Sequence, residues 1–176
     1  GAYLDKVVAR TRELGLDGLS FSGIPVFGSY TDQAAQKAVA SLFIEKFAAV
    51  AGPGKELLLL FEGDPQFLTP ADRSKVDYFV LDTKETDNAT DLKLQVLRAL
   101  SAGAVPCNKL LLGAMTEYEF TDEDKGAADA ISALTIRIPE IGPQPLAGLC
   151  IYSVNADYFG AEFIYPLTRQ AIQTLN

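Results

Sequence analysis

Hydrophobic positions along the chain follow two periods in turn, the period of helices and the period of strands. Residues 2–15 carry apolar side chains at helical spacing, and Gly15 is expected to end this helix. Residues 18–22 alternate apolar and polar side chains, which is the period of two that a strand shows. The continuous apolar run Leu57–Phe61 is typical of a strand buried on both faces of a parallel sheet.

The same two periods recur through the rest of the chain. Further strands are predicted at 77–81, 109–112 and 147–153, and further helices at 31–52, from Thr69, at about 89–102, from Thr121 and at 166–175. Strands that alternate with helices in this way imply parallel pairing through right-handed crossovers. Five such βα units fit either an open parallel α/β sheet or part of an eight-stranded (β/α)8 barrel. We expect a single domain over residues 1–176.

The helix that follows Thr31 is expected to bury one apolar stripe against the sheet. At helical spacing this stripe comprises Ala35, Val39, Leu42, Phe43, Lys46 and Val50.

Composition and charge exclude several classes of function. The formal net charge is −8, and no basic stripe is present, which argues against a nucleic-acid partner. No apolar run is long enough to span a bilayer. The chain has no histidine, so Ser-His-Asp and Cys-His catalysis and the commonest zinc ligand are all excluded. We expect no cofactor and no metal, and we expect Cys150 to act as a small buried hydrophobic residue.

One stretch resembles a known catalytic motif. Residues 17–24, Asp-Gly-Leu-Ser-Phe-Ser-Gly-Ile, are similar to the fourth-strand motif D-G-[LIV]-D-[FIL]-D-x-E of glycoside hydrolase family 18, the chitinases and endo-β-N-acetylglucosaminidases. Residues 76–82, 108–113 and 148–152 are similar to the sixth, seventh and eighth strands of that family. The resemblance covers nearly the whole chain and is greatest to divergent bacterial surface proteins of the family.

The resemblance implies a TIM-barrel-like fold in which this chain supplies the fourth to the eighth strands. The sheet edges would then be covered by a preceding segment of the complete protein, by a partner or by loops. The resemblance also implies an extracellular, periplasmic or surface-anchored location in a bacterium.

The resemblance places the family's acid chemistry at three positions that carry no acid here. The proton donor corresponds to Ile24, the aspartate that orients the substrate's acetamido group to Ser22, and the inner aspartate to Ser20. Isoleucine cannot donate a proton, and a serine hydroxyl is not an acid near neutral pH. The motif therefore predicts a pseudoenzyme, which lacks the usual catalytic groups.

Other polar and aromatic residues follow the predicted strands, where ligands of parallel barrels bind. Glu62 and Asp82 are the most plausible relocated acid pair, although both also fit as solvated loop carboxylates. For a sugar ligand, hydrogen-bonding groups and aromatic faces are needed. The predicted ligand-binding set comprises Ser20, Ser22, Glu62, Asp82, Tyr118, Tyr152 and Asn155.

Three functions remain open at this point. The preferred hypothesis is a non-catalytic protein that binds glycans containing N-acetylglucosamine. The second is an active glycosidase, of the chitinase or endo-β-N-acetylglucosaminidase type, that uses the relocated acids. The third is a structural or interaction domain that has kept the fold and lost the ligand.

Overall fold

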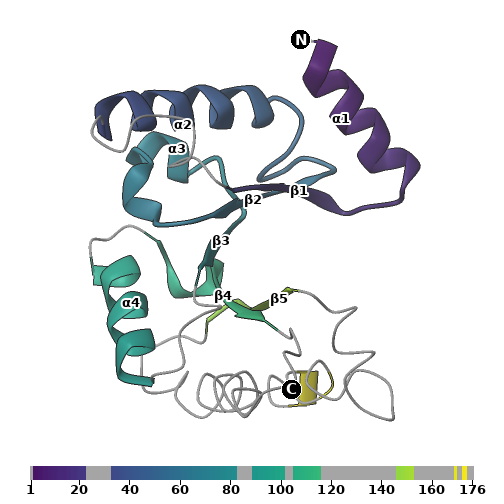
Figure 1. Cartoon of the computed structure of the whole chain (residues 1–176). Coiled ribbons are helices and arrows are strands. Elements are labelled where there is room, and N and C mark those ends of the chain that lie inside the picture. The colour runs from purple at the N-terminus through teal and green to yellow at the C-terminus, as the bar shows by residue number, and fades with distance from the viewer. Residues whose placement is uncertain are drawn as a thin grey trace. The chain divides into compact units, whose positions relative to one another are not determined.

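The computed structural model in Figure 1 describes residues 2–22, 33–82, 89–101, 105–115, 146–152, 169 and 172–173. Contacts within the chain group into two compact units, residues 1–80 with 102–105 and residues 81–101 with 106–176. The helix predicted from Thr121 lies outside the described residues, as does most of the helix predicted at 166–175. None of the described helices is long and apolar enough to cross a membrane.

The first helix of the first unit, α1 (Ala2–Glu13), ends where the sequence predicts. Gly15 has a φ of 64°, in the left-handed region that favours glycine. The Leu16 N–H donates to the Thr11 carbonyl and the Gly15 N–H to the Arg12 carbonyl, both at 3.0 Å. This pair of bonds is a Schellman motif, in which glycine ends the helix and two otherwise unpaired carbonyls gain donors.

Three parallel strands form the sheet of the first unit: β1 (Gly18–Phe21), β2 (Leu58–Glu62) and β3 (Tyr78–Leu81). β1 pairs with β2, and β2 pairs with β3, so strands that are next in sequence are neighbours in the sheet. Asp77 fixes the entry into β3, because its carboxylate accepts from the Leu59 N–H and its own N–H donates to the Leu59 carbonyl, both at 2.9 Å. The predicted parallel pairing is confirmed.

Helix α2 (Gln33–Phe47) lies along β1 and β2, with the short helix α3 (Pro70–Arg73) beside it (Figure 1). Of its predicted buried stripe, Phe43 does contact Phe21 of β1, but the fully buried positions lie one residue later than predicted. Gln36, Ala40 and Ile44 are buried, whereas Leu42 is 54% exposed. Because apolar residues occupy most of the helix circumference, their spacing alone does not fix which side faces the sheet. The small side chain of Ala40 suits the side that packs closely.

The second unit contains helix α4 (Ala89–Ser101) and two parallel strands, β4 (Leu110–Met115) and β5 (Gly148–Tyr152). α4 buries Leu92, Val96 and Ala99. β4 and β5 pair from Leu111–Gly148 to Met115–Tyr152. Cys107 and Cys150 are each half-buried rather than part of a closed core.

Candidate functional site

The two faces of the β1–β2 sheet differ, and the candidate site residues lie on one of them. The Phe21 ring is 5.1 Å from the Phe43 ring of α2, so Phe21 faces the helix. Since side chains alternate along a strand, Ser20 and Ser22 lie on the opposite face. Phe61 packs with Phe21 at 6.4 Å between ring centroids, which places Glu62 on the face of the two serines.

The strand register brings two of these residues to the same edge. Phe21 pairs with Phe61, so Ser22 and Glu62 each follow this pair at the carboxyl ends of neighbouring strands. Neighbouring strands lie about 5 Å apart. Ser22 is exposed and Glu62 half-buried. A hydroxyl that both donates and accepts, beside a carboxylate that accepts, is suited to binding a ligand rich in hydroxyl groups.

The other residues predicted for the site are placed separately. Ser20 is exposed within β1, Asp82 is exposed directly after β3, and Tyr152 is the half-buried last residue of β5. Ile24, Tyr118 and Asn155 lie outside the described residues. In the described part of the chain, no three His, Cys, Asp or Glu side chains gather in a way that could hold a metal ion.

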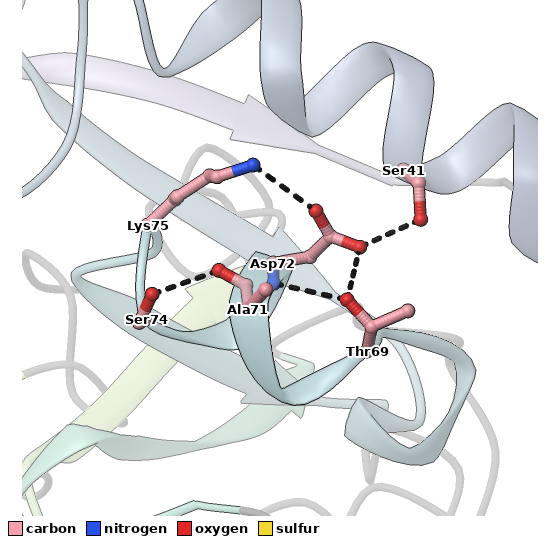
Figure 2. A network of polar contacts seen from close by, with 6 residues as sticks. All are labelled: Ser41, Thr69, Ala71, Asp72, Ser74 and Lys75. Carbon is pink, nitrogen blue, oxygen red and sulfur yellow. Dashed lines mark hydrogen bonds and ion pairs between the residues drawn. The ribbon is translucent and has the colours of Figure 1, made fainter.

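Asp72, a buried carboxylate that the sequence patterns did not single out, follows β2 along the chain. Figure 2 shows Asp72 of α3 at the centre of a polar network. Its Oδ2 accepts hydrogen bonds of 2.6 Å from the hydroxyls of both Ser41 and Thr69. Lys75 donates to its Oδ1 at 3.3 Å. Because Ser41 belongs to α2, the network holds α3 against that helix.

Thr69 and Asp72 also bond each other reciprocally at the start of α3. The Asp72 N–H donates to the Thr69 hydroxyl at 3.1 Å, while that hydroxyl donates to the Asp72 carboxylate. Thr69 is therefore the N-cap of α3, and the Asp72 carboxylate binds the Thr69 hydroxyl rather than the Thr69 N–H that a capping box would use. The local sequence Thr-Pro-Ala-Asp could therefore have indicated that Asp72 bonds Thr69. No local pattern indicates that Asp72 also bonds Ser41.

Opposing effects set the pKa of Asp72. Burial raises the pKa of this carboxyl, but hydrogen bonds from Ser41, Thr69 and Lys75, together with the Lys75 charge, lower it to a net value below the usual 3.8. A carboxyl with a depressed folded pKa stabilises the fold above its unfolded pKa. That stabilisation is lost as the pH falls through the folded pKa.

Asp72→Asn is therefore expected to lower the free energy of unfolding by about 2 kcal/mol at pH 7, since hydrogen bonds to a charged group are lost. The deficit should begin to shrink below about pH 3.9, where the carboxyl of the unfolded chain takes up a proton, and should disappear as the pH falls through the lower pKa of the folded carboxyl. Urea unfolding between pH 3 and pH 7 measures both effects. Asp17→Asn, at an exposed position, is the control, and a deficit for Asp72→Asn that is absent or constant with pH would contradict this account.

The comparisons with known proteins agree with this geometry. A family model described as glycoside hydrolase family 18, BT1044-like, matches residues 2–174. Among curated proteins none matches the sequence significantly. The parallel pairing of strands that are next in sequence, β1 with β2 and β2 with β3, agrees with an α/β fold of the (β/α)8-barrel class. The chain belongs to glycoside hydrolase family 18.

Solved structures with a similar fold cover nearly the whole chain. A selenomethionine form of BT1044 matches with a TM-score of 0.65 at 14% identity over 99% of this chain and 58% of its own. Endo-beta-N-acetylglucosaminidase from Cordyceps militaris matches with a TM-score of 0.70 at 17% identity over 98% of this chain and 61% of its own. YKL-39, solved in the presence of chitooligosaccharides, matches with a TM-score of 0.61 at 12% identity over 98% of this chain and 72% of its own.

These likenesses confirm the prediction of a partial (β/α)8-barrel-like fold. The chain spans about three fifths of the length of the first two of these structures.

Proposed function

We propose that this chain is a non-catalytic member of family 18 that binds glycans containing N-acetylglucosamine at the carboxyl edge of β1 and β2. The observation that carries the proposal is the open polar face of β1. It bears Ser20 and Ser22 at the positions where the family motif has aspartates. Serine retains hydrogen-bonding capacity for sugar hydroxyls but supplies no acid near neutral pH.

Two of the similar structures support this choice of ligand. One is an endo-beta-N-acetylglucosaminidase, and another was solved with chitooligosaccharides. Glu62, half-buried beside Ser22, would accept hydrogen bonds from sugar hydroxyls. A bacterial surface, the periplasm or the extracellular space is the location we propose for such a protein.

Calorimetric titration with chitotetraose and with an N-glycan tests the proposal. We expect saturable binding that Glu62→Gln weakens about tenfold, because a hydrogen bond to a charged acceptor is lost. Glu45→Gln, which removes an exposed carboxylate from α2, should bind as the wild type does. Absence of binding across the panel would refute the proposal.

Turnover of a chromogenic chitobioside separates binding from catalysis. We expect no product over a broad pH range. The second candidate, an active glycosidase with relocated acids, rests on the half-buried position of Glu62 at a strand end. Hydrolysis that Glu62→Gln abolishes would establish that candidate and exclude a non-catalytic role.

A further inference from the structure

The segment that follows Glu62 is held to the sheet at its first residue, Gly63. The Gly63 N–H donates to the Val80 carbonyl of β3 at 3.0 Å, so pairing with the sheet continues one residue beyond the strand. Gly63 has a φ of 137°, a backbone conformation that residues with a side chain rarely adopt.

The segment then folds into a short 3-10 helix, η2 (Pro65–Phe67). Asp64 caps it, because its carboxylate accepts from the Gln66 N–H at 2.9 Å. The Leu68 N–H closes the turn on the Pro65 carbonyl at 3.1 Å. Pro65 and Leu68 are buried, whereas Gln66 is exposed and Phe67 half-buried. The segment therefore rests on an apolar base and leaves an amide and part of an aromatic ring accessible.

Arg73 of α3 joins the two ends of this short helix. Its Nη1 donates to the Leu68 carbonyl at 2.9 Å and to the Pro65 carbonyl at 3.3 Å. The side chain preceding it, Asp72, ties α3 to Ser41 of α2. A chain of contacts thus runs from α2 through α3 to the segment beside Glu62.

We propose that Arg73 is a positioning residue of the glycan site, which holds Gly63–Leu68 as a preformed wall beside Glu62. The inference rests on the proposed function and identifies Gln66 and Phe67 as the side chains that this wall offers to a sugar. An amide can bond sugar hydroxyls, and an aromatic ring can pack on the apolar face of a pyranose. A wall that is ordered before binding costs little conformational entropy when the ligand arrives.

Amide hydrogen exchange of Arg73→Met tests the ordering directly, without a ligand. Exchange at Gln66, Phe67 and Leu68 should become about tenfold faster, since the two hydrogen bonds that the Arg73 guanidinium donates to the segment are lost. The Leu59 amide, bonded to Asp77, should exchange as before and so reports that the fold is intact. Arg98→Met, at an exposed site on α4, is the matched control, and Arg73→Lys should restore part of the protection.

Titration of the same variants with chitotetraose tests the role in binding. Arg73→Met should bind about five- to tenfold more weakly than the wild type, and Arg73→Lys should lie between them. Unchanged exchange in the segment, or unchanged affinity despite faster exchange, would overturn the inference. If the wild type bound no glycan while the exchange result held, the proposed function and the role in binding would fail, and the ordering by Arg73 would stand.

Discussion

Gly52→Ala is expected to lower the free energy of unfolding by about 3 kcal/mol, through backbone strain and overpacking together. Gly52 has a φ of 113°, which a residue with a side chain adopts only with strain. A Cβ atom at this position would lie 2.5 Å from the Lys75 carbonyl oxygen and 3.7 Å from the Leu59 Cβ. Because the nearest obstacle is backbone, the clash cannot be relieved by a change of rotamer.

Gly54→Ala is the matched control for this variant. Its φ of 76° is also positive, but a Cβ there meets nothing within 4 Å. It should cost only the conformational strain, about 1 kcal/mol. Urea denaturation of the two variants and the wild type measures both losses. Equal losses would show that the approach of residues 52 and 75 is not as close as the structure has it.

Phe61→Ala should destabilise the protein by about 3–5 kcal/mol, since it opens a cavity in the aromatic core of the first unit. Phe61 is 2% exposed and lies between Phe21, at 6.4 Å, and Phe79, at 6.2 Å. Phe43→Ala is a suitable comparison, because Phe43 touches the same Phe21 ring but is 36% exposed. Denaturant titration should show a much larger loss of unfolding free energy for Phe61→Ala than for Phe43→Ala. A larger loss for Phe43→Ala would contradict the packing described.

The sequence was sufficient to predict the parallel α/β fold, because the spacing of hydrophobic residues along the chain distinguishes strands from helices. It was insufficient for the orientation of α2, where apolar residues on most sides leave the rotation about the helix axis undetermined. Gln36, Ala40 and Ile44 are the buried residues, and this depends on tertiary packing rather than on the local pattern.

The candidate site shows the same division between local and long-range information. Ser22 was predicted as a site residue from its position in the resembled motif, and Glu62 because it follows a strand pattern, but their adjacency depends on the β1–β2 register. The role of Arg73 was not predictable, since its acceptors are main-chain carbonyls, which every residue carries. Likewise Ser41 lies far from Asp72 in sequence, and only folding brings the two together.

We propose that the carboxyl edge of β1 and β2 binds N-acetylglucosamine-containing glycans without hydrolysing them. An NMR titration of the isotopically labelled protein with chitotetraose tests both parts in one sample. We expect saturable shifts of the Ser22, Glu62 and Gln66 amides and little change at Gly18 and Asp77, which lie at the opposite strand ends. The sugar signals should stay those of the intact oligomer. Shifts confined to the opposite ends, no shifts at all, or the appearance of shorter oligomers would contradict the proposal.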